Sequence, residues 1–116
     1  MYKFKKVKLK NGIEKLLIEF EDKSKEVLST FLEFEIDDFG DIIVPLIDKV
    51  LHNKSEFEEF NGNAVGIRIS EDKSHIYSLF DFEDNEENCI IETKELRNLI
   101  DIWLKKLDEF DKTGEV

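Results

Sequence analysis

The chain has 116 residues, of which 41% are hydrophobic and 39% are charged, and its formal net charge is −11. A chain of this length buries about two thirds of its surface on folding, which suffices for one core without a disulfide or a metal. The composition therefore predicts a single domain spanning residues 1–116 and excludes a disordered chain.

The charges are distributed unevenly along the chain. The first ten residues contain five lysines and no acid, so residues 11–116 hold 28 acids against 12 bases, a formal charge of −16. Nucleic acids and anionic membranes require a basic footprint, which disfavours both as direct partners. The acidity suits a cationic protein partner, with simple solubility as the alternative.

A single cysteine, Cys89, excludes an internal disulfide and indicates a reducing compartment. The first residues, MYKFKKVKLK, lack the apolar core of a signal peptide. Apolar runs fall far short of the ~20 residues that span a bilayer. We therefore expect a soluble, cytoplasmic protein.

The first third of the chain is expected to contain strands. Asn11-Gly12 is a strong hairpin signal between the segments 2–10 and 13–20. The lysines of segment 2–10 are expected to face carboxylates on neighbouring strands and to protect a sheet edge.

Segment 26–36, EVLSTFLEFEI, alternates between apolar and polar residues. One expected face carries Leu28, Thr30, Leu32, Phe34 and Ile36, whereas the other carries Ser29, Phe31, Glu33 and Glu35. This pattern predicts a half-buried strand with an acidic outer surface.

The segment that follows is expected to be helical. Its buried stripe has the spacing of an amphipathic helix and contains Ile43, Leu46, Ile47, Val50 and Leu51. Pro45 fits best within a first turn, so the regular helix is expected to begin near Asp41 or Ile42. If the helix begins earlier, at Asp38, it should kink at Pro45.

The rest of the chain is expected to contain short strands and a final helix. The strands are predicted at 56–60, 64–70, 75–80 and 89–92. Thr93 is the expected N-cap of the helix, whose apolar stripe contains Leu96, Leu99, Ile100, Trp103, Leu107 and Phe110. The predicted fold is α+β: a mainly antiparallel sheet of about six or seven strands with two α-helices packed on one face.

Catalytic and metal sites are not indicated by the sequence. The two histidines, His52 and His75, have no spacing that makes a zinc site or a nucleophile–base pair with Cys89. The segment 81–92 resembles a calcium loop, but Glu86 occupies the position that requires glycine. We expect no catalytic residue, no bound metal and no cofactor. Trp103 is expected to be a core residue rather than a binding aromatic.

The acidic residues are the candidate binding residues. Residues 81–88 read DFEDNEEN, and carboxylates this close repel each other, so folding gains nothing from them. A solvated surface is one interpretation, and a surface that recognises a basic partner is the other. The candidate contact residues are Glu33, Glu35, Asp37, Asp38, Asp81, Glu83, Asp84, Glu86 and Glu87.

Three segments resemble a family of small acidic immunity proteins of Gram-positive bacteria: EIDDFGDIIVPLIDKVL, SEFEEFNGNAVGIRI and CIIETKELRNLIDIWLKKL. These proteins are the antitoxin partners of polymorphic toxins, including the LXG type, and are similar in role to the immunity proteins of contact-dependent growth inhibition. The resemblance implies a cytoplasmic protein that binds and blocks a toxin domain, commonly a nuclease. It implies no particular functional residue.

Three functions are therefore open at this stage. The first is an immunity protein that neutralises a toxin, for which a nuclease cleft shaped for phosphates would supply the basic surface. The second is an acidic interaction or regulatory protein, such as a nucleic-acid mimic, acting on a basic host factor. The third is an enzyme, which no motif in the sequence favours.

Overall fold

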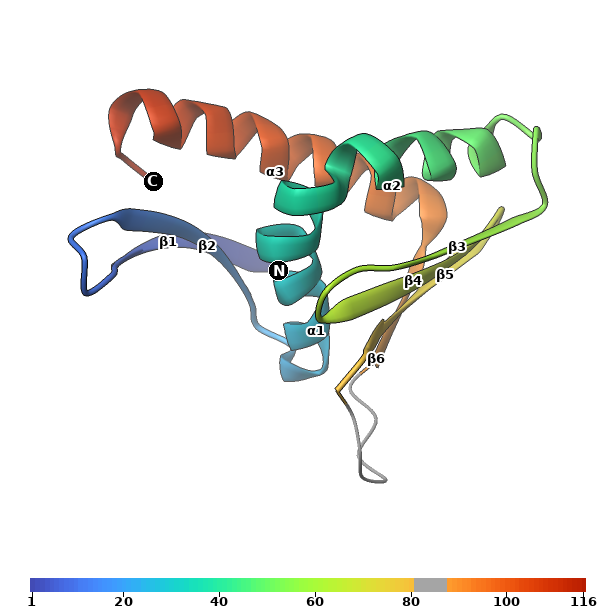
Figure 1. Cartoon of the computed structure of the whole chain (residues 1–116), viewed down its shortest axis with the longest axis horizontal. Helices are drawn as coiled ribbons and strands as arrows, with labels where there is room; N and C mark the ends of the chain where they lie inside the picture. Colours follow the sequence, from blue (N-terminus) through green and yellow to red (C-terminus); the bar gives the residue numbers. More distant parts are fainter. Residues whose placement is uncertain (81–87) are drawn as a thin grey trace.

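The computed structural model describes residues 1–80 and 88–116. Within them, six strands form two antiparallel sheets, a hairpin and a four-stranded sheet with the order β3-β4-β5-β6. This confirms the predicted α+β class and antiparallel pairing, with the strands divided between two sheets (Figure 1). The elements are β1 (Tyr2–Lys8), β2 (Glu14–Phe20), η1 (Lys23–Lys25), α1 (Glu26–Thr30), η2 (Phe31–Glu35), α2 (Ile36–Leu51), β3 (Phe57–Asn61), β4 (Val65–Ser70), β5 (Lys73–Ser78), β6 (Asn88–Glu92) and α3 (Thr93–Thr113).

The hairpin of β1 and β2 turns at the predicted Asn11-Gly12. Gly12 has a φ of +85°, a conformation that glycine adopts without steric cost. The Asn11 side chain accepts a hydrogen bond from the N–H of Ile13 at 3.0 Å, and the N–H of Leu9 donates to the carbonyl of Ile13 at 2.8 Å. These bonds close the turn and fix the register of the two strands.

The prediction of a strand at 26–36 is wrong, because this segment is helical throughout. It forms α1, the π-helix η2 and the first residue of α2. The buried side chains recur with the spacing of a single helix face and are Val27, Leu28, Phe31, Leu32, Glu35 and Ile36. The strand reading would have placed Phe31 outside and Phe34 inside, whereas Phe31 is fully buried and Phe34 is 45% exposed.

Helix α2 begins at Ile36 and is interrupted at Phe39, which has non-helical dihedral angles (φ −128°, ψ 16°). The chain changes direction there, from the helix that runs beside the sheets to the part of α2 that lies across the top of the molecule in Figure 1. The helix therefore begins before Asp41, and its kink is at Phe39 rather than at Pro45. The Phe39 ring packs against Phe60 of β3, with ring centroids 5.3 Å apart. This contact anchors the bend to the four-stranded sheet.

The inner face of the four-stranded sheet and the helices enclose the hydrophobic core. Ile67, Ile76 and Cys89 are partners across β4, β5 and β6, and all three are buried. Helices α2 and α3 cover this face, as predicted (Figure 1). The predicted stripe of α3 is also confirmed, since all its members are buried except the partly buried Leu107.

Thr93 does not cap α3 with its side chain, contrary to the prediction. Its hydroxyl is fully buried, donates to the carbonyl of Ser70 at 2.6 Å and lies 2.9 Å from the hydroxyl of Ser74. The Thr93 side chain thus joins the start of α3 to the β4–β5 hairpin instead of accepting a hydrogen bond from a free N–H in the first turn of its own helix.

Helix α3 also reaches the hairpin sheet. Trp103, only 2% exposed, stacks on Phe4 of β1 with ring centroids 6.3 Å apart, which confirms it as a core residue. At the end of α3, Gly114 (φ +70°) donates its N–H to the carbonyl of Phe110, and Lys6 donates to the carbonyl of Gly114 at 3.0 Å. Helix α3 therefore contacts both sheets, as does α1, which packs on β2, β5 and β6.

Candidate binding surface

Glu35 is buried (1% exposed), so the prediction that it faces outward is wrong. Its carboxylate accepts hydrogen bonds from the N–H groups of Asn63 (2.9 Å) and Ala64 (3.0 Å), in the turn between β3 and β4. Gly62 leaves space for this carboxylate, because a Cβ there would overlap Glu35. Glu35 therefore holds the β3–β4 turn against η2 and is not accessible to a partner.

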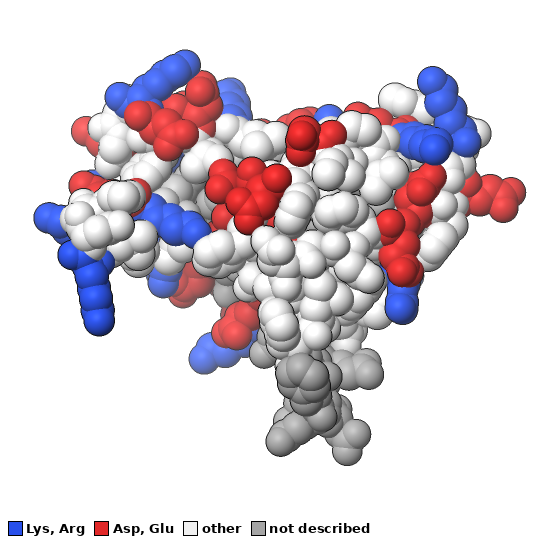
Figure 2. Space-filling model, viewed as in Figure 1, with Lys and Arg blue, Asp and Glu red and all other residues white. Residues whose placement is uncertain are grey.

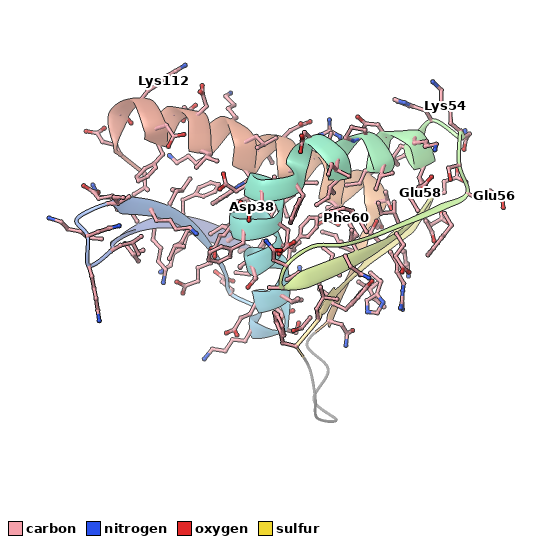
Figure 3. All side chains as sticks on the ribbon, viewed as in Figure 1. Asp38, Lys54, Glu56, Glu58, Phe60 and Lys112 are labelled. Carbon is pink, nitrogen blue, oxygen red and sulfur yellow. The ribbon has the colours of Figure 1, made fainter. Side chains whose placement is uncertain are left out.

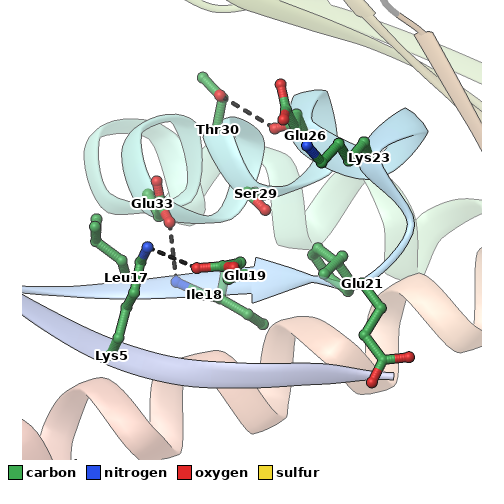
Figure 4. A pocket seen from close by; sticks show the side chains of 11 residues that line it. Lys5, Leu17, Ile18, Glu19, Glu21, Lys23, Glu26, Ser29, Thr30 and Glu33 are labelled. Carbon is green, nitrogen blue, oxygen red and sulfur yellow. Dashed lines mark hydrogen bonds and ion pairs between the residues drawn. The ribbon is translucent and has the colours of Figure 1, made fainter.

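Glu33 lies between η2 and the outer edge of β2, and it is half-buried (Figure 4). Its carboxylate accepts a hydrogen bond from the N–H of Ile18 at 2.9 Å, which satisfies a donor on the strand edge that faces away from β1. Burial raises the pKa of Glu33, and the Ile18 N–H and the Lys15 charge offset part of this rise. Glu33 thus attaches the hairpin to the helix.

A cavity of about 520 Å³ lies beside Glu33, between β2 and α1. Its charged groups have both signs, and Lys5 and Glu19 are paired across it at 2.6 Å (Figure 4). The pairing with Lys5 lowers the pKa of Glu19. A cavity in which the charges are already partly compensated offers no strong preference for a basic or an acidic ligand.

Asp37 and Asp38 are exposed, as predicted, and Asp41 joins them at the bend of α2. None of the three forms an ion pair within residues 1–80 and 88–116. Asp38 lies far from Lys54 and Lys112, which mark opposite ends of the molecule (Figure 3). Acidic side chains gather at this position in Figure 2. The bend of α2 therefore carries uncompensated negative charge.

The other predicted contact residues lie outside the described part of the chain: Asp81, Glu83, Asp84, Glu86 and Glu87. The strand that follows them, β6, packs on η1 and the start of α1, and the Lys25 charge acts on Cys89. Asp37 follows Lys25 by twelve residues of helix, which correspond to about 18 Å at 1.5 Å per residue. The start of β6 and the α2 acids are thus at opposite ends of this helix.

A groove between the hairpin tip and the end of α3 brings acidic and apolar residues together, and we call it the Trp103 groove. Its volume is about 260 Å³. Two of the predicted acids, Glu33 and Asp37, line it with Glu14 and Asp111, which the sequence did not indicate. The remaining lining residues are Leu9, Ile13, Lys15, Leu16, Trp103, Leu107 and Phe110.

The sequence gives little signal for this groove, because it is formed by residues up to about a hundred positions apart. Leu9 and Ile13, apolar residues on either side of the Asn11-Gly12 turn, are 44% and 59% exposed. Two apolar residues flanking a hairpin turn are a sequence feature that could have pointed to the groove.

Two of the five lysines among the first ten residues face carboxylates across the hairpin, in line with the prediction. Lys5 pairs with Glu19 at 2.6 Å, and Lys6 pairs with Glu14 at 3.1 Å, each across the hairpin. Exposed pairs of this kind add little to stability. Lys3, Lys8 and Lys10 are exposed and form no ion pair in the described ranges, so the positive charge of this segment is compensated only in part.

The outer face of the four-stranded sheet is uncovered by helices and carries apolar side chains. Phe57 is 51% exposed and Ile90 is 63% exposed. Between them, Arg68 lies 4.8 Å from the centroid of the Tyr77 ring and donates to Glu59 at 2.9 Å. Arg68 and Glu59 are therefore paired on this face, whereas the three acids at the bend of α2 form no ion pair in the described ranges.

Catalytic chemistry finds no support in residues 1–80 and 88–116. No group of three His, Cys, Asp or Glu side chains there could hold a metal ion. His52 is exposed at the end of α2, and His75 is half-buried on β5 with its ring 5.4 Å from Tyr77. Cys89 is buried, and this burial raises its pKa, so the thiolate is disfavoured.

Comparison with known proteins identifies one similar sequence. Over 87 residues, or 75% of this chain, the sequence is 37% identical to a Bacillus cereus protein named "Immunity protein", and the match covers 74% of that protein. No family model and no solved structure matches the chain. No helix in the described ranges has the length and apolarity needed to cross a membrane.

Proposed function

Because the chain belongs to the immunity-protein family of its Bacillus cereus relative, we propose that it binds a cognate bacterial toxin domain and neutralises it. The proposed toxin is a nuclease of the polymorphic type, and the proposed site of action is the cytoplasm of the cell that must be protected. The chain acts by binding rather than by catalysis, and it requires no cofactor.

The physical basis of the proposal is charge. A nuclease must hold phosphates in a cationic cleft, and an acidic protein can occupy that cleft by presenting carboxylates instead. This chain has a net charge of −11. The observation that supports the proposal best is the group of exposed, unpaired carboxylates at the bend of α2: Asp37, Asp38 and Asp41.

The proposed contact residues are Asp37 and Asp38 at the bend of α2 and, as a second group, the acidic residues of 81–87. Glu33 takes part through the groove that it lines. Glu35 acts indirectly in this proposal, because its buried carboxylate holds the β3–β4 turn and cannot reach a partner.

Growth protection tests the proposal directly. The chain is co-expressed with the toxin domain encoded beside its gene, and we expect growth to be restored and the two proteins to co-purify. A variant in which Asp37, Asp38 and Asp41 are replaced by Lys should lose protection while remaining folded. Normal growth inhibition in the presence of the unaltered chain would refute the proposed function, whereas co-purification with a basic host protein would favour the regulatory alternative.

A further inference from the structure

We propose that the Trp103 groove receives one lysine or arginine side chain of the toxin, an inference that rests on the proposed function. The groove differs from the rest of the acidic surface because it combines carboxylates with an apolar interior. Its volume of about 260 Å³ is below the range of about 300–1,000 Å³ typical of small-molecule pockets, and it suits an inserted side chain.

The apolar part of the groove fits the aliphatic stem of a long basic side chain. Trp103 and Leu16 are 2% and 1% exposed and belong to the core, and Leu107 and Phe110 continue the same surface along α3. Lysine and arginine bury their methylene groups against such surfaces and keep the charged group at the rim. The exposed side chains of Leu9 and Ile13 extend this apolar surface at the hairpin tip.

The charges around the groove favour a cation. Four carboxylates line it, and one of them, Glu14, is already paired with Lys6. The single basic residue in the lining, Lys15, holds its ammonium group 3.5 Å from the centroid of the Phe34 ring. Asp37 and Asp111 form no ion pair in the described ranges and stand on different helices. They are the groups available to an incoming ammonium or guanidinium.

A core tryptophan also makes the groove observable. Trp103 is the one tryptophan of the chain, and its indole Nε1 has no hydrogen-bond partner among the described residues. Its N–H therefore gives a single indole signal in a ¹H–¹⁵N spectrum. A side chain that enters the groove must change the surroundings of this ring.

The test compares acids that line the groove with exposed acids outside it. Asp37→Asn and Asp111→Asn alter the lining, whereas Glu56→Gln and Glu109→Gln remove two negative charges from exposed positions outside both the groove and the bend of α2. Binding of the cognate toxin domain is measured by surface binding kinetics. We expect the Asp37→Asn/Asp111→Asn variant to dissociate at least about tenfold faster, because a desolvated ion pair acts mainly on dissociation. The Glu56→Gln/Glu109→Gln variant should dissociate at the unaltered rate.

Equal dissociation rates for the two double variants would overturn the groove proposal and leave toxin neutralisation intact. Failure of the unaltered chain to bind its toxin would instead refute the proposed function. An independent arm uses a tetra-arginine peptide as the probe and follows the Trp103 indole signal. A concentration-dependent shift that the Asp37→Asn/Asp111→Asn variant lacks is expected, and an unmoved signal overturns the groove proposal without any reference to the toxin.

Discussion

Glu35 and Gly62 depend on each other at the residue scale. The carboxylate bonds to two backbone N–H groups and occupies the space that a Gly62 side chain would need. Gly62→Ala should therefore displace the carboxylate and leave those donors unsatisfied, at a cost of about 1–3 kcal/mol in the free energy of unfolding. Urea denaturation measures this loss.

Gly40→Ala is the matched control for this prediction. A Cβ at Gly40 would lie 3.6 Å from Ile36, an ordinary contact, and alanine favours a helix over glycine by about 1 kcal/mol. We expect Gly40→Ala to be neutral or stabilising. A Gly62→Ala variant as stable as Gly40→Ala would contradict the role assigned to Glu35.

A second prediction at the residue scale concerns Glu33 and the dependence of stability on pH. Burial raises its pKa above the ordinary value of 4.5, so above that pH the folded protein binds more protons than the unfolded chain. Ionisation of Glu33 therefore lowers the free energy of unfolding as pH rises from the pKa of Glu33 in the unfolded chain to its higher pKa in the folded protein. Glu33→Gln keeps an oxygen for the Ile18 N–H and cannot ionise, so the variant should gain stability relative to the unaltered chain as pH rises above 4.5.

Glu19 supplies a control of opposite sign. Its hydrogen bond and charge interaction with Lys5 lower its pKa, so its contribution to stability is present above 4.5 and is lost as pH falls through the folded value. Glu19→Gln should therefore be less stable than the unaltered chain at neutral pH, and this difference in the free energy of unfolding should disappear in acid. Unfolding curves are recorded across the pH range, and parallel stability curves for Glu33→Gln and the unaltered chain would count against the buried position of Glu33.

At the scale of elements, the sequence predicted those segments in which one periodicity dominates. The Asn11-Gly12 hairpin, the stripe of α3 and the strands of the second sheet all have one consistent pattern, and the structure confirms them. Segment 26–36 satisfies two patterns, since apolar residues occupy both alternate positions and a helix face. Each reading buries one phenylalanine, but the helix also buries Val27 and so places one more apolar side chain in the core, which favours the helix. The pairing of Glu35 with the distant β3–β4 turn is a tertiary feature that no local pattern reports.

The prediction at the scale of elements concerns the effect of Pro45 on the stability of α2. It is exposed in the middle of α2, and the interruption of that helix is six residues earlier, at Phe39. A proline inside a helix removes a hydrogen bond and crowds the preceding turn. Pro45→Ala should therefore raise the free energy of unfolding by about 1–3 kcal/mol. Thermal or urea unfolding measures the gain. A loss of stability would mean that the fixed dihedral angle of Pro45 is needed to form the bend.

At the scale of the whole molecule, the composition predicted an acidic surface but not where its charges are free. Cross-strand pairs compensate Lys5 and Lys6, and Arg68 and Arg97 each engage acids nearby. Three adjacent unpaired acids, Asp37, Asp38 and Asp41, lie together at the bend of α2, which exists because the chain turns at Phe39. Asp37 was identified from its position in an acidic run, whereas its partner in the groove, Asp111, depends on how α3 packs. The sequence thus predicts the sign of the surface charge, whereas the packing of the helices decides where the unpaired acids lie.

The last prediction concerns salt. If Asp37, Asp38 and Asp41 meet a basic cleft, association should be electrostatically steered and approach about 10⁸ M⁻¹s⁻¹ at low ionic strength. The Debye length falls from ~10 Å at 0.1 M salt to ~3 Å at 1 M, so added salt should slow association strongly and affect dissociation less. Replacing the three aspartates by Lys should give slow association even at low salt. The same reversal at Glu56, Glu71 and Glu92, three exposed acids around the four-stranded sheet, changes the net charge equally and should slow association less. Stopped-flow mixing with the toxin domain measures these rates. An association rate that is flat with salt, or equal for the two triple variants, would mean that the carboxylates at the bend of α2 do not guide the encounter.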